Sequence, residues 1–462
     1  MRVCSRILCA VLLAAACLAA PPAAALVTVD WVTVGNPGNP PDTQVITCCW
    51  SSNGTSGYGS VGYVYRIATY EFTVAHYTEL LNAVAWDSDP NGLYHSLMAT
   101  GNPNVSMPAS ILRSGSAGSY IYTAVVGRED DPVPYVDFYD ALRLANWLTN
   151  GQPIGIQNEL TTEDGAYELL GANPDPDLVT RKTATGVFVA TEAEWYKAAY
   201  YDPFDPGADA PSGVGPNPTT PTLDYWVFPM RSDTSIASIP PDTPPTAANY
   251  WNATGLNEPP HVEPPCGTES PCEPTQTGAY VNSPSPWGTF DQGGNHFEWT
   301  QTMSPDLSSQ GAKQQVIRGG YFLRNWGDLR STLRSAAPTF CNSCNGVAIR
   351  LVKLDTECSD GFDNDGDGAA DLDDLGCASP ASDNESPQCQ DGLHNDSDGR
   401  IDFDGGVSAG VAEPTLPDVQ CTSPTKDREA KAGGSACGLG GELALLLLPI
   451  QWLRRRRGRA LS

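Results

Sequence analysis

Basic residues are scarce in this sequence: 26 Lys and Arg stand against 54 Asp and Glu, and the net charge at pH 7 is −28. Proteins that bind a phosphate backbone need clustered Lys and Arg, so this charge balance argues against nucleic-acid binding. The sequence also lacks a serine-hydrolase elbow and a phosphate-binding loop. Its 5 His residues show no paired spacing such as H-x-x-x-H. The usual sequence signatures of hydrolases, nucleotide-binding proteins and His-based metal sites are therefore missing.

Glycine and proline, by contrast, are abundant, with 45 and 40 residues. This composition is typical of a loop-rich chain, but 11 Trp and 18 Tyr supply material for a hydrophobic core. We therefore expect a folded protein with little regular secondary structure. Its 462 residues exceed one ordinary domain, although length alone does not fix the number of domains.

Residues 1–25 have the pattern of a secretory signal peptide. Arg2 and Arg6 precede an apolar stretch over 7–20, and small residues end the segment. We predict cleavage near Ala25, and a lipoprotein site at Cys17 is the alternative. An exported protein is expected to oxidise most of its Cys residues.

Residues 433–462 have the pattern of a cell-surface anchor. Cys437 precedes a short apolar stretch over 443–453, which is followed by Arg residues at 454–457. The stretch is short for a membrane-spanning helix, and the Arg cluster would stay in the cytoplasm with the main body outside. The segment resembles bacterial surface-sorting signals, in some of which a Cys before the apolar run is processed. A simple tail anchor is the alternative.

The rest of the chain divides into two regions by composition. Residues 26–354 contain nearly all the aromatic residues and are expected to form one large domain. Residues 355–432 are acidic and contain spaced Cys residues. Between Glu357 and Asp404 there are fifteen Asp or Glu and a single basic residue, Arg400. This concentration of carboxylates predicts a cation-binding segment.

The acidic region contains an internal repeat. The sequence Cys358-Ser-Asp-Gly-Phe-Asp-Asn-Asp-Gly-Asp-Gly returns as Cys389-Gln-Asp-Gly-Leu-His-Asn-Asp-Ser-Asp-Gly. Alternating carboxylates can converge on one hard cation while Gly permits the sharp turn, as at the start of a calcium loop. The predicted calcium ligands are Asp363, Asp365, Asp367, Asp371 and Asp374 in the first copy, and Asp396, Asp398 and Asp402 in the second.

Neither copy has evident flanking helices, so the repeats look more like the calcium repeats of thrombospondin type 3 than like paired EF-hands. The second copy has His394 where the first has Asp363, and Asp374 stands where a calcium loop usually has a bidentate Glu. We therefore expect modest affinity. The candidate disulfides are Cys358–Cys377 and Cys389–Cys421, although sequence does not establish connectivity. A merely solvated acidic linker is the alternative.

A series of short motifs runs through the large domain. Two of them predict helices, one over 137–148 with Asp137 as its N-cap and one over 191–200 capped by Thr191. The other motifs, in chain order, are Tyr70-Glu-Phe-Thr-Val-Ala-His-Tyr77, Ala248-Asn-Tyr-Trp251, Gly288-Thr-Phe-Asp-Gln-Gly-Gly-Asn-His-Phe-Glu-Trp299, Arg318-Gly-Gly320, Arg330-Ser-Thr-Leu-Arg334 and Gly346-Val-Ala-Ile-Arg-Leu-Val352.

In this order the motifs resemble the formylglycine-generating-enzyme, or sulfatase-modifying-factor, family. The resemblance implies an α+β fold, the formylglycine-generating-enzyme variant of the C-type lectin fold, with two helices, small twisted sheets and long ordered loops. The Gly and Pro content agrees with such a fold. The motif residues Trp147, Trp195 and Trp299 are expected to lie in the core.

Family members bind calcium at the segment that matches residues 291–298. Carried over to this sequence, the resemblance implies carboxylate ligands from Asp291 and Glu298 and carbonyl ligands from Gly294 and His296. Such a mixture of oxygens suits a hard cation. A hydrogen-bonded turn under Trp299 is the alternative.

A second family calcium site begins at Asn249 and the Tyr250 carbonyl. Its remaining ligands would fall within the Pro-rich stretch 253–279, where the residues do not align with the family. Only Asn249 and the Tyr250 carbonyl can therefore be assigned to this second site.

Formylglycine-generating members bind copper through two Cys residues, five positions apart, and activate oxygen beside a substrate Cys. The resemblance places these positions at Trp326 and Ser331, and no Cys occurs between Arg318 and Phe340. A serine cannot supply the thiolate that suits Cu(I). Cys341 and Cys344 are expected to form a local disulfide. A related branch that makes sulfoxide bonds uses a three-histidine iron site on an N-terminal helical domain, which this sequence lacks.

These observations favour an exported, surface-anchored, calcium-binding protein without catalytic activity. Its partners would be a surface ligand, either a glycan or a protein, and the membrane through the C-terminal segment. Two alternatives are a metal-dependent oxidoreductase related to formylglycine-generating enzyme and a structural cell-surface protein. The fold by itself does not decide among them.

Overall fold

The structure is a computed structural model. It describes residues 26–45, 55–169, 171, 173–203, 225–234, 236–238, 241, 246–250, 273–303, 314–339, 346–361, 363–364, 367–379, 382, 384–393, 395, 400–409, 411 and 414–426. The chain forms two compact units that meet in sequence between Leu354 and Asp355, and each is described by itself. Several predictions lie outside the described residues: the signal peptide, the C-terminal anchor with Cys437, the Cys341–Cys344 disulfide, and Asp365, Asp396 and Asp398.

Within the described residues, no helix has the length and apolar character needed to cross a bilayer.

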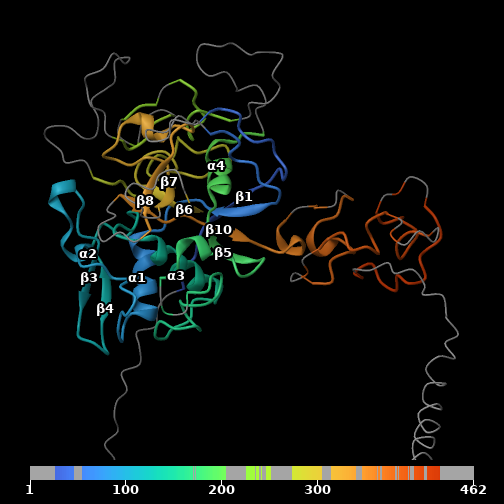
Figure 1. Cartoon of the computed structure of the whole chain (residues 1–462), viewed down its shortest axis with the longest axis horizontal. Coiled ribbons are helices and arrows are strands. Elements are labelled where there is room, and N and C mark those ends of the chain that lie inside the picture. Colours follow the sequence, from blue (N-terminus) through green and yellow to red (C-terminus); the bar gives the residue numbers. More distant parts are fainter. Residues whose placement is uncertain are drawn as a thin grey trace, which may run out of the picture. The chain divides into compact units, whose positions relative to one another are not determined.

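The first unit contains a four-stranded antiparallel sheet in the order β1-β2-β10-β5. Its strands are β1 (Trp31–Val34), β2 (Tyr65–Ala68), β5 (Gly186–Val189) and β10 (Leu351–Leu354). Strands from the start, middle and end of the unit thus pair with one another, so this sheet joins segments that are far apart in the sequence (Figure 1).

A second four-stranded sheet has the order β8-β7-β6-β9. Its strands are β6 (Phe297–Met303), β7 (Gln314–Arg318), β8 (Ser335–Pro338) and β9 (Val347–Ala348). The β6–β9 pairing is parallel and the other two are antiparallel. A separate hairpin pairs β3 (Ile111–Ser114) with β4 (Ile121–Ala124).

Three α-helices of more than two turns begin with a capping box. They are α1 (Val74–Val84), α3 (Phe138–Thr149) and α4 (Glu192–Tyr200), with Thr73, Asp137 and Thr191 as N-caps. The cap side chain accepts a backbone N–H that would otherwise lack a partner. The predicted helices α3 and α4 and their caps are confirmed, whereas α1 is an additional helix. Shorter helices are α2 (Leu97–Thr100) and the 3₁₀ turns η1 (Pro103–Val105), η2 (Pro176–Leu178) and η5 (Trp326–Leu329).

The helices cover the sheets with their apolar faces, and the core lies between them. Helix α3 packs on β5, and α4 contacts β6. Trp147 of α3, Trp195 of α4 and Trp299 of β6 are each at most 1% exposed, so the prediction that they belong to the core is confirmed. Few helices, short strands and long described loops give the mixed, loop-rich fold that the composition predicted.

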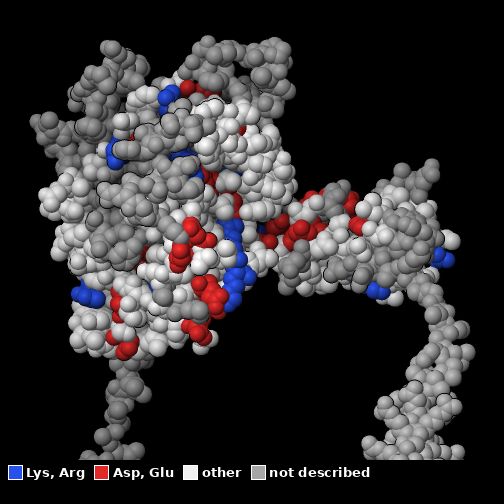
Figure 2. Space-filling view, in the orientation of Figure 1, with Lys and Arg blue, Asp and Glu red and all other residues white. Residues whose placement is uncertain are grey.

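The second unit has only short turns, η6 (Glu357–Ser359) and η7 (Asp371–Asp373), and is held by two disulfides. Cys358–Cys377 and Cys389–Cys421 are both formed, which confirms the predicted pairing. Carboxylates gather on its surface, and between residues 355 and 426 the only basic residues are Arg400 and Lys426 (Figure 2).

The two copies of the acidic repeat share one hydrogen-bond pattern. Gly361 N donates to Asp371 Oδ1 at 3.0 Å, and Gly392 N donates to Asp402 Oδ2 at 3.0 Å. The side chain of Asn364 donates to Asp360, and that of Asn395 donates to Asp391. Equivalent residues are 31 positions apart throughout, so the sequence repeat is also a structural repeat.

Candidate functional site

Glu298, a predicted calcium ligand, lies in a buried ion pair with Arg350. The Arg350 guanidinium reaches the carboxylate with both arms, Nε to Oε2 at 2.7 Å and Nη2 to Oε1 at 2.8 Å. Trp195 Nε1 donates to Glu298 Oε2 at 2.6 Å. All three side chains are fully buried. Both oxygens of Glu298 are thus committed to protein donors in this conformation.

Asp291 lies in the loop before β6 and has a left-handed backbone conformation, with φ of 61°. Its Oδ2 accepts from Gly278 N at 2.6 Å. Burial raises the pKa of Asp291 to about 6, and the Gly278 hydrogen bond and the charge of Arg350 only partly oppose this rise. A positive charge placed near this carboxylate would therefore stabilise its ionised form.

Gly294 and His296, the predicted carbonyl ligands, lie in the same tightly packed turn. Gly294 has φ of 95°, and a Cβ on it would lie 2.5 Å from Asn249 O, so only glycine fits there. The His296 side chain is fully buried and packs edge-on against Phe322. The turn holds the backbone of 294–296 against the segment that contains Asn249.

Glu71 adds a third buried carboxylate to this region, and the sequence analysis did not identify it. Its Oε2 accepts from Asn295 Nδ2 at 2.9 Å, whereas its Oε1 has no partner among the described residues. Burial raises the pKa of Glu71 well above its usual range, and the negative charges of Glu298 and Asp291 raise it further. Three carboxylates therefore share one guanidinium, that of Arg350. The surplus of negative charge and the unpartnered Glu71 oxygen leave these carboxylates without full compensation by the described residues.

The structure shows which residues lie near Asn249, the first residue of the second predicted calcium site. Asn249 Nδ2 donates to Glu273 O at 3.0 Å, and Thr275 N donates to Asn295 Oδ1 at 3.0 Å. The Glu273 side chain forms a salt bridge with Arg128. Glu273 thus places its backbone carbonyl next to Asn249, whereas its carboxylate is paired with Arg128, and Thr275 contacts Asn295. No recognisable motif links Glu273 and Thr275 to Asn249 across the Pro-rich segment, so the sequence did not identify them as neighbours.

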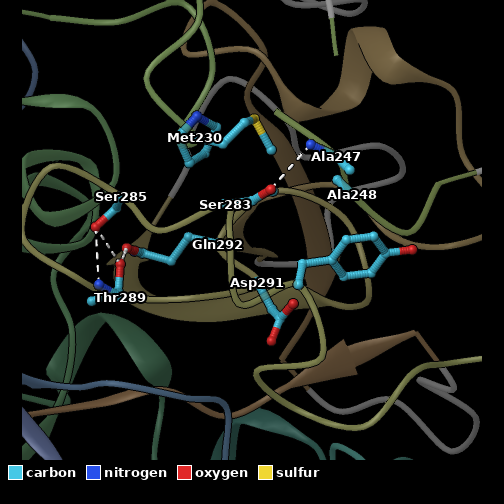
Figure 3. Close-up of a pocket in the computed structure, with 11 residues that line it drawn as sticks. Met230, Ala247, Ala248, Ser283, Ser285, Thr289, Asp291 and Gln292 are labelled. Carbon is cyan, nitrogen blue, oxygen red and sulfur yellow. Dashed lines mark hydrogen bonds between the residues drawn. The ribbon is translucent and has the colours of Figure 1, made fainter. Parts of the chain in front are cut away.

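A small pocket lies beside Asp291, lined by Met230, Ala247, Ser283, Thr289 and Gln292 among others (Figure 3). Thr289 hydrogen-bonds both Ser285 and Gln292, and Ala247 N donates to Ser283 Oγ at 3.0 Å. The volume is about 10 Å³, which is room for roughly one water molecule. The pocket can hold a water or an ion but no organic substrate.

Ser331 and Trp326, at the positions that the resemblance assigns to catalysis, are part of a packed cluster. Ser331 is fully buried, and its hydroxyl has no hydrogen-bond partner among the described residues. Trp326 stacks on the Arg330 guanidinium, which lies 4.7 Å from the ring centroid, and contacts Phe228 at 6.1 Å between centroids. Ser331 is thus closed off from solvent, whereas Trp326 and Arg330, which pack on each other, are half-buried.

The loop that carries Ser331 is anchored by two arginines on one carboxylate. Arg318 Nη2 and Arg334 Nη2 lie 2.6 Å and 2.9 Å from oxygens of Glu192. Arg318 Nη1 also donates to Ser331 O at 3.0 Å. Glu192 is the first residue of α4, so the helix start fixes the backbone of the loop.

In the acidic unit, the described carboxylates mostly bond their own loops. Asp363 accepts from Asp367 N and Gly368 N, and Asp371 accepts from Gly361 N. Glu385, which the sequence analysis did not select, is fully buried and accepts from Asn364 N and Asp371 N. Burial raises its pKa to about 7. Glu385 thus ties the first loop to the segment between the disulfides.

Across the described part of both units, no three His, Cys, Asp or Glu side chains are grouped closely enough to hold a metal ion. Asp291 lies near enough to Glu298, and Asp374 near enough to Asp363 and Asp367, for their charges to interact, but the described side chains do not converge on one point.

Comparison with known proteins gives a family for the first unit. Residues 61–354 match the family described as "Sulfatase-modifying factor enzyme 1-like domain". A search of curated proteins gave no match.

Three solved structures are similar to the chain. CarF is 17% identical, with 71% of this chain and 99% of that one covered and a TM-score of 0.39. Treponema denticola variable protein 1 is 15% identical, with coverage of 70% and 94% and a TM-score of 0.37. PvdO from Pseudomonas aeruginosa is 17% identical, with coverage of 70% and 91% and a TM-score of 0.34.

Proposed function

The chain belongs to the sulfatase-modifying factor enzyme 1-like family through residues 61–354, and on this basis we propose that it is a non-catalytic, ligand-binding member, stabilised by calcium and displayed at the cell surface. The first unit would have the formylglycine-generating-enzyme variant of the C-type lectin fold. The acidic unit would be a calcium-binding stalk of thrombospondin type 3 character, ahead of a C-terminal sorting or anchor segment.

One observation carries the non-catalytic part of the proposal: the environment of Ser331. Family members that generate formylglycine need two thiolates for Cu(I), and the segment from Arg318 to Phe340 contains no Cys. Ser331 is buried with an unpartnered hydroxyl, and Trp326 lies under the guanidinium of Arg330. A hydroxyl stays protonated near neutral pH and binds Cu(I) poorly, and an indole offers no ligand at all.

The calcium part of the proposal is supported by buried carboxylates that lack sufficient positive charge. Glu71, Asp291 and Glu298 share a single Arg350, and Glu71 Oε1 has no partner among the described residues. A bound calcium ion would supply the missing charge there and would carry no chemistry in this proposal. Glu71 and Asp291 are the residues best placed to hold it, because Glu298 is already occupied by Arg350.

An assay for formylglycine formation tests the proposal directly. The full chain is incubated with Cu(I), oxygen, a reductant and a sulfatase-type Cys peptide, and the peptide mass is followed. We expect no thiol-to-aldehyde conversion above a metal-free control, for both the wild type and Ser331→Cys, because one thiolate leaves the metal half-coordinated. Conversion by the wild type would overturn the proposal in favour of an oxidoreductase.

The ligand-binding part needs a separate experiment. Glycan arrays and cell-surface protein fractions are probed with the full chain in millimolar calcium and in chelator. Specific capture that calcium strengthens would support a binding domain. Equal, weak retention on all surfaces in both conditions would favour a structural cell-surface protein instead.

A further inference from the structure

Among the buried side-chain oxygens of the acidic unit that have no hydrogen-bond donor in the described residues, two belong to side chains that contact each other. They are Asp374 Oδ2 and Gln390 Oε1. Asp374 is 2% exposed and Gln390 is 1% exposed, so bulk water does not reach them in place of a partner. A buried acceptor without a donor costs about 1–3 kcal/mol. Two such atoms in a unit of this size require an explanation.

The two residues belong to one hydrogen-bonded pair. Gln390 Nε2 donates to Asp374 Oδ1 at 3.1 Å, and Gly376 N donates to the same oxygen. Both of these donors are directed at Asp374 Oδ1, so Asp374 Oδ2 and Gln390 Oε1 receive no hydrogen bond from them. An amide and a carboxylate joined in this way present two acceptors within one small volume.

The pair also joins the two copies of the repeat. Asp374 ends the first loop, three residues before Cys377, whereas Gln390 directly follows Cys389, which opens the second copy. Each residue is held next to a disulfide, so neither can withdraw easily. Any group that satisfies both oxygens would fasten the first copy to the second.

The electrostatic surroundings favour a cation over a water molecule as that group. Asp374 interacts with the negative charges of Asp367 and Asp363, and its only favourable partners are the hydrogen bonds from Gly376 and Gln390. No basic side chain compensates among these interactions. A water could donate two hydrogen bonds but would leave the accumulated negative charge in place.

We propose that a calcium ion binds between the two copies, held by Asp374 Oδ2 and Gln390 Oε1, with water completing its coordination. Carboxylate and Gln carbonyl oxygens are both ordinary calcium ligands. This inference rests on the proposed calcium binding by the acidic unit and adds to the loop ligand Asp374 a partner, Gln390, from the other copy, which the loop motif does not contain. With few protein ligands the affinity is low, in the range of extracellular calcium modules at about 10⁻⁴–10⁻³ M.

Hydrogen-exchange mass spectrometry of the full chain, titrated with calcium chloride, tests the inference. Peptides that cover 371–377 and 389–393 report the site, and the calcium concentration for half-maximal protection is measured. Gln390→Glu adds a carboxylate ligand and should lower that concentration about tenfold, because affinity rises with ligand charge. Gln390→Met removes the carbonyl and should raise it about tenfold.

Asn384→Asp is the matched control, because it adds the same charge at an exposed position of the same segment. It should shift the midpoint by no more than about twofold, since exposed charges are screened. If calcium protects the unit but both Gln390 variants behave like the wild type, the inter-copy site is wrong and loop binding stands. If calcium protects no peptide between 355 and 426, both this inference and the proposed calcium binding of the unit fail.

Discussion

Arg350 and Glu298 meet in an ion pair from which water is excluded, with both arms of the guanidinium on both carboxylate oxygens at 2.7 Å and 2.8 Å. Arg350 also donates to Ala68 O at the end of β2 and to Phe290 O in the loop before β6. One side chain therefore joins the first sheet, the second sheet and the loop of the proposed calcium site.

Arg350→Met should destabilise the domain by about 3–5 kcal/mol, because it leaves Glu298 charged, buried and unpaired. Chemical denaturation followed by Trp fluorescence measures the change. Arg324→Met is the control: Arg324 is 62% exposed at its side chain and lies 3.9 Å from Asp328, so its loss should cost less than about 1 kcal/mol. Equal effects of the two variants would show that the buried pair is dispensable.

Calcium should raise the melting temperature of the full chain relative to chelator. A ligand that binds only the native state stabilises it by about 2.7 kcal/mol at a hundredfold excess over Kd. Glu71→Gln should reduce this shift in the first unit, because it removes a negative charge that acts together with those of Asp291 and Glu298. Magnesium at the same concentration controls for ionic strength. An unchanged melting temperature in calcium would mean that the predicted sites bind none.

Ser331→Ala should leave the free energy of unfolding unchanged or raise it by about 1 kcal/mol, because it removes a buried hydroxyl that makes no hydrogen bond. The matched control is Ser285→Ala, which removes a hydroxyl that hydrogen-bonds Thr289 N and Thr289 Oγ1 and should cost about 1 kcal/mol. Loss of stability in Ser331→Ala as large as in Ser285→Ala would show that the Ser331 hydroxyl is engaged.

Asp137→Asn should make the domain less sensitive to pH between about 4 and 6. Burial raises the pKa of Asp137 from 3.8 to about 6, so the folded state keeps the proton on this carboxyl to a higher pH than the unfolded state does. The free energy of unfolding therefore falls as pH rises through that window. Asn keeps a capping oxygen at the start of α3 but does not titrate. It also removes a charge that raises the pKa of Asp140.

Unfolding in denaturant at pH 4 and pH 7 measures this effect. Relative to the wild type, the variant should gain on the order of 1–2 kcal/mol more at pH 7 than at pH 4. The reverse ordering would mean that the Asp137 carboxylate is stabilised by its surroundings instead.

The sequence was a good guide wherever a local pattern has a local cause. Asp137 and Thr191 were identifiable as caps because a cap acts on residues two or three positions away. The disulfide partners were readable because each pair closes a short loop around one copy of the repeat. Family motifs likewise pointed to Asp291 and Glu298 as neighbours of one buried region.

Contacts between segments that are distant in the sequence could not be predicted from it. Glu71 lies in a quoted motif, yet only the fold brings it to Asn295, 224 positions away. Arg350 also lies in a motif, but its ion pair with Glu298 follows from the parallel pairing of β9 with β6, which places Ala348 opposite Glu298. Gln390 follows a Cys in a polar stretch, and its burial against Asp374 depends on how the two copies pack.

Because both copies of the acidic repeat have the same hydrogen bonds, the length of the acidic unit can change by whole copies of the repeat. Each copy closes on itself through its own Gly-to-Asp bond, Gly361 to Asp371 and Gly392 to Asp402, rather than by borrowing residues from the other. Duplication or loss of one 31-residue copy would thus leave the remaining closure intact. A change in copy number would therefore alter the length of the acidic unit without any change to the residues of the large domain.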